Sequence, residues 1–162
     1  MLVKLYRLPP LAPVMDPLTA EGIRIRRAHL DEKHGITHWV EAHFGHGWAM
    51  GCEIAIAHRP VTCYIAVVLD QSPIPRDDLY AVPAELLIGF ALYDVGAKGL
   101  FGPIGVREDY RGRDIGTGLL LRSLHTMADD GYDYAVIGQV GPAEFYEKTV
   151  GAVIIEDSER KN

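Results

Sequence analysis

The chain has 162 residues, of which 48% are hydrophobic and 23% charged, a composition typical of one globular domain with a substantial core. A net charge of −6 argues against nucleic acid or an anionic membrane as the main partner. No segment approaches the roughly 18 consecutive apolar residues of a membrane span. Cys52 and Cys63 form no Cys-x-x-Cys pair, so we expect a reduced, cytoplasmic protein.

The first 22 residues are expected to differ in character from the rest. Residues 1–8 are expected to form a short strand, and the proline-rich residues 9–22 a connector. Ile23 and Ile25 then alternate with arginines, which predicts a strand with both isoleucines facing inward. We expect residues 23–156 to form the folded domain and residues 157–162 a polar tail.

Two helices are predicted after this strand. Asp31 has the residue type of an N-cap, and Gly45 marks the end of the first helix. The apolar stripe of this helix is expected to face the core and comprises Ile36, Trp39, Val40 and Phe44. A second, short helix is predicted over residues 51–58.

Three strands are predicted next. Residues 61–69 are apolar enough for a strand that is buried on both faces, and residues 85–95 form the following strand after a polar loop over residues 71–83. Residues 99–106 also have a strand-like pattern, but Pro103 cannot donate a hydrogen bond to a neighbouring strand. We therefore expect this strand to be bulged and splayed from a neighbour.

A turn with Gly112, Gly116 and Gly118 and three arginines separates this strand from a helix. The helix is predicted from an apolar stripe at period 3.6, formed by Leu120, Leu124, Met127 and Ala128. The N–H groups of a first helical turn have no intrahelical partner, and glycines let an anion approach them. The spacing fits neither a Walker loop nor a dinucleotide fingerprint. The turn therefore predicts a site for another phosphorylated ligand.

The remaining residues predict three more elements. Gly131 ends the helix, and residues 134–140 form a strand. Pro142 is expected to begin a helix that Gly151 terminates. Residues 152–155 form a last strand.

The glycine-rich turn resembles a loop of the GNAT superfamily of N-acetyltransferases, which binds the pyrophosphate of acetyl-CoA. In this chain it reads Tyr110-Arg-Gly-Arg-Asp-Ile-Gly116. The matching residues are Arg111, Ile115, Gly116 and the pair Leu119-Leu120. Asp114 replaces the usual first glycine, and a carboxylate beside a pyrophosphate should weaken binding unless it points away.

A second motif is similar to a GNAT signature and follows the first in the expected order. It reads Phe145-Tyr146-Glu147-Lys148 and is followed by Gly151, with one extra residue before the glycine. The order of predicted elements over residues 23–156 is also similar to that of the superfamily.

The resemblance implies an α/β fold, also classed as α+β. A mixed, mostly antiparallel central sheet would be flanked by helices and splayed at its fourth strand. It implies acetyl transfer by direct attack, from acetyl-CoA as co-substrate to the primary amine of a small molecule or peptide. The alternative is an acyl-CoA-binding regulatory module that has lost turnover, which Asp114 favours and Tyr146 does not.

The resemblance also assigns residues to the cofactor. Backbone N–H groups of Ile104, Gly105 and Val106 would bind pantetheine and polarise the thioester carbonyl. The pyrophosphate would be held by the turn, through Arg111, Gly112, Arg113, Asp114, Ile115, Gly116 and Thr117. Gln139 either contacts the cofactor or is an exposed strand-end glutamine.

Tyr146 is implied to be the acid that protonates the CoA thiolate; the alternative is a half-buried structural tyrosine. The general base is Glu53, Asp94 or a water relay, and each carboxylate is otherwise a solvated surface group. Residues 46–48 are implied to line the acceptor pocket.

The histidines predict no metal site. His34, His38, His43 and His46 lie close together in sequence, but no His-Glu-x-x-His motif occurs and no cysteine or carboxylate ligand stands at a fixed offset.

Members of the superfamily usually end with two strands after the last helix, whereas only residues 152–155 remain here. We hypothesise that residues 3–8, in this chain or in a partner, supply the missing strand, which makes a homodimer possible.

Overall fold

The computed structural model describes residues 1–69 and 85–158, so the predicted loop over residues 71–83 and the last four residues of the tail lie outside the described part. Within it, six strands form one sheet in the order β1-β6-β5-β4-β3-β2. Neighbouring strands are antiparallel except β5 and β6, which are parallel. The strands are β1 (Leu2–Lys4), β2 (Ile23–Arg27), β3 (Cys63–Leu69), β4 (Glu85–Tyr93), β5 (Leu100–Val106) and β6 (Tyr134–Ile137).

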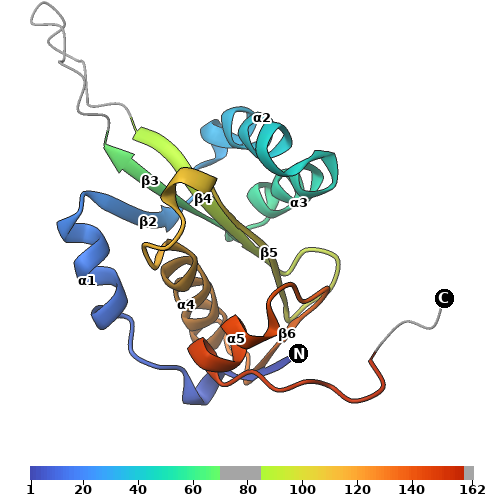
Figure 1. The fold of residues 1–162 in the computed structure, drawn as a ribbon. Coiled ribbons are helices and arrows are strands. Elements are labelled where there is room, and N and C mark those ends of the chain that lie inside the picture. The colour runs from blue at the N-terminus through green and yellow to red at the C-terminus, as the bar shows by residue number, and fades with distance from the viewer. Residues whose placement is uncertain (70–84, 159–162) are drawn as a thin grey trace, which may run out of the picture.

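Helices cover both faces of this sheet, as Figure 1 shows. The helices on one face are α1 (Ala12–Ala20), α4 (Ile115–Asp129) and α5 (Ala143–Val150). Those on the other face are α2 (Lys33–Phe44) and α3 (His46–Ala57). The predicted α/β class, with a mixed and mostly antiparallel sheet, is confirmed. None of the helices in the described ranges is long and apolar enough to cross a membrane.

Two hydrophobic cores lie on the two faces of the sheet. Because side chains of a strand alternate between faces, Tyr64 and Ala66 of β3 pack on the α4 side, and Cys63, Ile65 and Val67 pack on the α2–α3 side. The prediction that this strand is buried on both faces is therefore confirmed.

Strand β5 diverges from β6 after its first two residues. Leu100 pairs with Val136 and Phe101 with Ile137, and the pairing of these two strands ends there. On its other side, β5 follows β4 as far as Val106, with a shift of register between Ala91 and Tyr93. The predicted bulge and splay are confirmed, and they leave one edge of residues 104–106 facing away from β4.

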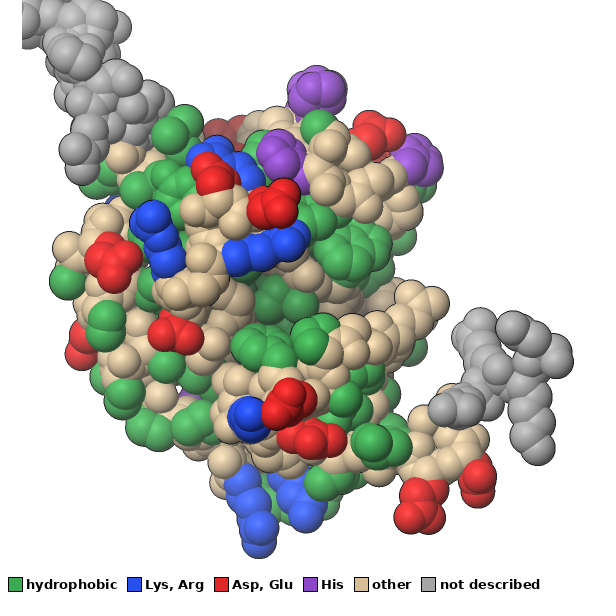
Figure 2. Space-filling model, in the orientation of Figure 1, with side chains coloured by type: hydrophobic (Ala, Val, Ile, Leu, Met, Phe, Trp, Pro, Cys, Tyr) green, Lys and Arg blue, Asp and Glu red, His purple; other side chains and the backbone are tan. Residues whose placement is uncertain are grey.

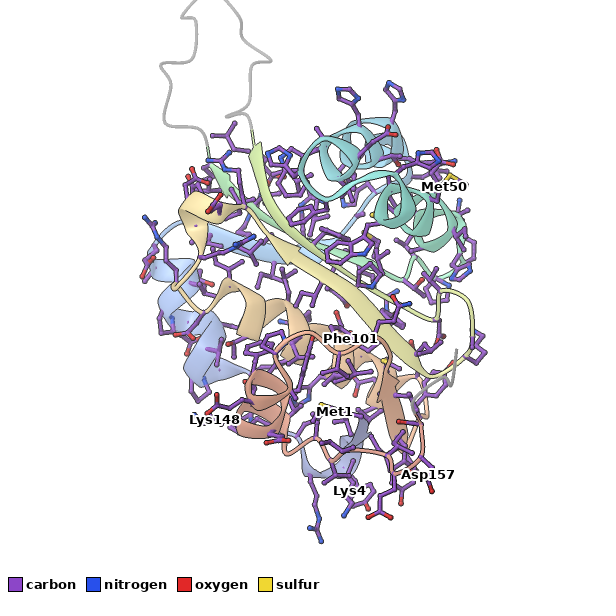
Figure 3. The ribbon with its side chains drawn as sticks, turned by 45° about the vertical axis from the view of Figure 1, so that its right-hand side comes forward. Met1, Lys4, Met50, Phe101, Lys148 and Asp157 are labelled. Atoms are coloured by element: carbon purple, nitrogen blue, oxygen red, sulfur yellow. The ribbon has the colours of Figure 1, made fainter. Side chains whose placement is uncertain are left out.

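The amino-terminal segment supplies an edge strand within the same chain. β1 pairs antiparallel with β6, and Leu2 forms an isolated bridge with Val153. Met1 belongs to the same core as Phe101, and Figure 3 labels both side chains. The hypothesis of a missing strand is confirmed at Leu2–Lys4 rather than at residues 3–8, because Leu5–Arg7 form a 3₁₀ helix.

The prediction of a connector over residues 9–22 was wrong, because Ala12–Ala20 form α1. Pro13 lies in the first turn of this helix, where no N–H donor is needed. Pro17 lies inside it, but Leu18 is only 2% exposed, so packing against the core stabilises the helix beyond its propensity.

Asp31 does not cap a helix, which was a further error. Instead, the carboxylate of Glu32 accepts the backbone N–H of His29 at 2.7 Å and pairs with Arg26 at 2.6 Å. Asp31 lies inside the short 3₁₀ helix Leu30–Glu32.

Two boundaries and one strand also differ from prediction. α3 begins at His46, five residues earlier than expected, because Gly45 is both the C-cap of α2 and the N-cap of α3. β6 ends at Ile137, where the chain leaves the sheet. Residues 152–155 make one bridge instead of a strand, because their partner β1 is itself short.

The in-chain position of β1 can be tested with a matched pair of substitutions. Val3 is fully buried, so Val3→Ala should lower the free energy of unfolding by about 2 kcal/mol. Val153 is 47% exposed and contacts Leu2 through its backbone, so Val153→Ala should cost less than about 0.5 kcal/mol. Chemical denaturation measures both values, and equal costs would contradict this placement of β1.

Candidate functional site

A cleft of about 700 Å³ lies where β5 diverges from β6, and we call it the β5 cleft. The face shown in Figure 2 is hollowed near its centre, with hydrophobic side chains in the hollow. The lining residues are Phe44, Trp48, Ile104, Gly105, Val106, Tyr110, Arg111, Gly112, Asp114, Ile115, Gly116, Thr117, Pro142, Phe145, Tyr146, Lys148 and Thr149. The glycine-rich turn, the splayed strand and the second sequence motif therefore meet in one place.

The first turn of α4 supplies backbone donors to the cleft. The first hydrogen bond of the helix joins the N–H of Gly118 to the carbonyl of Asp114 at 2.8 Å. The N–H groups of Ile115, Gly116 and Thr117 precede it and have no acceptor within the helix. Together with the positive end of the helix dipole, these donors have the arrangement that binds anions at helix N-termini.

Two glycines of α4 have different structural roles. A Cβ on Gly116 would lie 3.9 Å from Val106 Cγ2 and 4.0 Å from Phe145 Cζ, so it would point between two walls of the cleft. A Cβ on Gly118 would lie 2.6 Å from Ile25 Cδ1, inside the core. Gly118 allows α4 to approach β2 closely, whereas Gly116 keeps the cleft open.

Asp114 adopts a left-handed backbone conformation in the turn. Its φ of 58° is left-handed, a conformation that favours glycine and that aspartate tolerates better than most residues. Its carboxylate lies 3.5 Å from the hydroxyl of Thr117 and is exposed at the cleft. An anion bound here would therefore meet one negative charge beside the helix donors.

The arginines of the turn are organised around Tyr110. Arg107 pairs with Asp109 at 2.6 Å, and its guanidinium lies 4.7 Å from the centre of the Tyr110 ring. Arg113 lies 5.2 Å from the same ring. Of the two arginines assigned to the pyrophosphate, only Arg111 lines the cleft, and its Nε donates to the carbonyl of Val106 at 3.2 Å.

The free edge of β5 supplies a second set of donors. The N–H of Arg107 donates to the carbonyl of Ile88 in β4 at 2.8 Å. Because successive residues of a strand direct their N–H groups to opposite sides, Gly105 also faces β4, and Ile104 and Val106 face the gap beside β6. The sequence assigned all three residues to the cofactor, but the geometry leaves only Ile104 and Val106 with their N–H groups toward the cleft.

Tyr146 lies on α5 with its ring packed into the core and its side chain lining the cleft. It is 6% exposed, and burial raises the pKa of its hydroxyl above the ordinary value. Phe145 packs edge-on against it, with ring centres 5.0 Å apart. The hydroxyl therefore stays protonated throughout the neutral range.

Asp94 lies in a different place. It lines a separate hollow of about 810 Å³, the Asp94 hollow, and accepts hydrogen bonds from Tyr132 Oη at 2.7 Å, Gly99 N at 2.8 Å and Lys98 Nζ at 3.0 Å. Burial alone would raise the pKa of Asp94, but these bonds bring it below its ordinary value. The carboxylate fixes the turn between β4 and β5 and is not brought to the β5 cleft.

Neither Glu53 nor Gln139 lines the β5 cleft. Glu53 is partly exposed on α3, and Gln139 is exposed after β6 with a φ of 45°.

Several residues line the cleft that the sequence did not assign to the site. Phe44 packs against the core as expected and also against Trp48 at one end of the cleft. Phe145, Lys148 and Thr149, which lie beside Tyr146 along α5, also line the cleft. The second motif was the available signal for Phe145 and Lys148, and Thr149 directly follows it.

The four clustered histidines, His34, His38, His43 and His46, are exposed on α2 and at the start of α3, and Figure 2 shows histidine side chains on the outer surface there. His43 stacks on Trp39 with ring centres 4.5 Å apart, and His46 contacts Glu41 at 2.9 Å. In the described part of the chain, no group of three or more His, Cys, Asp or Glu residues is placed to hold a metal ion.

Comparison with known proteins gave matches only among solved structures. No family model and no curated protein match the chain. A GCN5-related glucosamine N-acetyltransferase region of a fungal multidomain GH3 β-N-acetylglucosaminidase aligns over 92% of the chain and 19% of its own, with 14% identity and a TM-score of 0.66. A GCN5-related N-acetyltransferase from Sphaerobacter thermophilus aligns over 91% of the chain and 45% of its own, with 19% identity and a TM-score of 0.62.

A third structure aligns over nearly all of its own chain. It is AAC(6')-Iy in complex with the bisubstrate analogue CoA-S-monomethyl-acetylneamine, which aligns over 86% of this chain and 98% of its own, with 13% identity and a TM-score of 0.52. This chain thus spans less than half of the first two proteins and nearly all of the third. The sheet order, the splayed β5 and these alignments show that the chain has the GCN5-related N-acetyltransferase (GNAT) fold.

Proposed function

We propose that the protein transfers the acetyl group of acetyl-CoA to the primary amine of a small molecule or peptide by direct attack. One observation carries the proposal: the β5 cleft combines the donors of the α4 turn, the free edge of β5 and the hydroxyl of Tyr146. The structure of AAC(6')-Iy with a CoA-containing analogue supports a CoA ligand for this fold.

The cleft residues fit the chemistry of acetyl-CoA. The N–H groups of residues 115–117, together with Arg111, would hold the pyrophosphate. Gly116 leaves room for it because this residue has no side chain. The N–H groups of Ile104 and Val106 would bind the amide groups of pantetheine as a neighbouring strand would. The volume of about 700 Å³ lies within the usual range for cofactor sites.

In the proposed reaction, the amine nitrogen attacks the thioester carbonyl carbon and forms the new C–N bond. The developing negative charge on the carbonyl oxygen is stabilised by a donor on the β5 edge, and we assign this role to the N–H of Val106. The C–S bond then breaks, the sulfur takes the proton of Tyr146, and the tyrosinate regains a proton from the water that receives the proton of the amine. At ordinary pKa values of about 10 for a tyrosine and about 8.5 for a thiol, this proton transfer is uphill by roughly 2 kcal/mol, and the burial that raises the pKa of Tyr146 widens the difference.

The attacking amine must also lose a proton. Because Glu53 and Asp94 do not line the β5 cleft, we assign this step to a chain of water molecules.

The two free, buried cysteines, Cys52 and Cys63, support a reducing location such as the cytoplasm.

An acyl-CoA-binding module without turnover is the second candidate. Asp114 favours it, because its carboxylate stands beside the anion site. Assays of acetyl-CoA hydrolysis and of acetylation over a panel of amines separate the two candidates, because the module would bind acetyl-CoA and convert none of it.

The pyrophosphate site can be tested through ligand-induced stabilisation. Acetyl-CoA should raise the melting temperature of the wild-type protein by mass action. Gly116→Val should abolish this shift, because its branched side chain would fill the space between Val106 and Phe145. Differential scanning fluorimetry measures both.

The matched control is Gly35→Val, in which a Cβ on an exposed position of α2 meets nothing within 4 Å. This variant should keep the shift. An unchanged shift in Gly116→Val would mean that the α4 turn does not hold the ligand.

The role of Tyr146 can be tested by removing only its hydroxyl. Tyr146→Phe should lower kcat by about 10²–10⁴-fold, with little change in the Kd for acetyl-CoA, because the ring keeps its packing. The control is Tyr132→Phe, which removes a hydroxyl that binds Asp94 in the other hollow. This control should lower stability by about 1 kcal/mol and leave turnover per molecule intact. Turnover of Tyr146→Phe within about threefold of wild type would remove Tyr146 from the mechanism.

A further inference from the structure

The two aromatic residues at one end of the β5 cleft form what we call the aromatic wall, Phe44 and Trp48. Their rings are nearly parallel, with an angle of 18° and centres 5.5 Å apart. Trp48 is 39% exposed although it also packs edge-on against Phe90, with ring centres 6.0 Å apart. A large ring is therefore fixed on one side and open toward the cleft on the other.

The wall is held rigidly by its neighbours. A Cβ on Gly105 would lie 2.8 Å from the ring of Phe44. Because Gly105 has no side chain, the Phe44 ring can pack directly against β5. Gly45, with a φ of 96°, ends α2 and begins α3, which sets the two rings beside each other. A ring that is already fixed loses little conformational entropy when a ligand stacks on it.

The wall lies across β5 from the proposed pyrophosphate site. Phe44 and Trp48 belong to the helices on one face of the sheet, and the α4 turn and α5 lie on the other. A ligand on the wall would thus meet the thioester from the side opposite to the pyrophosphate, at the free edge of residues 104–106. This is the position that an attacking amine needs.

Charge is distributed unevenly along the cleft. Among the lining residues that the structure describes, the charged ones are Arg111, Asp114 and Lys148, from the turn and α5. The lining residues from α2 and α3 are the two aromatic ones. An acceptor with several positive charges would therefore lose hydration at the wall without gaining a carboxylate there, whereas a flat apolar group would bury its surface on the rings.

We propose that Trp48 determines acceptor specificity and that the acceptor is a primary amine carried on a planar aromatic body, such as an arylalkylamine. The ring of the acceptor stacks on the indole of Trp48 and its amino group extends toward Val106. This assignment rests on the proposed acetyl transfer and adds the chemical class of the acceptor.

The test compares three amines, 2-phenylethylamine, n-hexylamine and spermidine, with the wild-type protein and Trp48→Ala. The wild type should give the highest kcat/KM with 2-phenylethylamine, at least about tenfold above spermidine. Trp48→Ala should lower kcat/KM for 2-phenylethylamine about tenfold and for n-hexylamine about threefold or less, at constant Kd for acetyl-CoA. Trp48→Phe should recover most of the loss, because it restores a ring.

Met50→Ala is the control, because Met50 is 46% exposed on the outer side of α3 and does not line the cleft (Figure 3). This variant should behave as wild type. Equal losses on all three amines in Trp48→Ala, no loss at all, or a wild-type preference for spermidine would each overturn the assignment.

Calorimetric titration of 2-phenylethylamine into protein saturated with CoA separates this inference from the proposed function. If no amine is acetylated but 2-phenylethylamine binds and Trp48→Ala abolishes the binding, the acetyltransferase proposal fails and the aromatic site stands. If acetylation of other amines occurs without any binding or turnover of 2-phenylethylamine, the inference fails and the acetyltransferase proposal stands.

Discussion

The candidate site depends on backbone hydrogen bonds that β5 does not make. β5 pairs with β6 at Leu100 and Phe101 and then leaves it, so none of the strands in residues 1–69 and 85–158 lies beside the outward N–H groups of Ile104 and Val106. Buried or half-buried amides need a partner, and a ligand with amide groups in an extended chain can take that place. The divergence therefore creates both the space of the β5 cleft and the donors that line it.

The same divergence lets both faces of the sheet contribute to one cleft. From one face come the first turn of α4, open because Gly116 has no side chain, and α5 with Tyr146. From the other come Phe44 and Trp48, which reach β5 because Gly105 has no side chain. Two glycines on opposite faces would thus allow the proposed cofactor and acceptor to approach the same strand edge from different sides.

The parts of the site that could be predicted from the sequence are encoded locally. Pro103 cannot donate a hydrogen bond to a neighbouring strand, and the turn from Gly112 to Gly118 joins a strand to an amphipathic helix, so the splay and a candidate anion site could both be predicted. What could not be predicted depends on contacts between distant segments. Asp94 was a candidate base, but its hydrogen bonds to Lys98 and Tyr132 hold it in another hollow. Phe44 was expected only in the core, because nothing in the nearby sequence indicates that Gly105 lies beneath its ring. Helix α1 was missed because burial of Leu18, rather than propensity, stabilises it.

The central claim is that acetyl-CoA binds along the free edge of β5 and the first turn of α4. A titration of ¹⁵N-labelled protein with acetyl-CoA, followed by amide chemical shifts, tests it most directly. The account predicts large shifts for Ile115, Gly116, Thr117 and Val106, and a small one for Gly105, whose N–H faces β4. Shifts confined to Gly96 and Gly131 of the Asp94 hollow, or none in the α4 turn at saturating ligand, would contradict it.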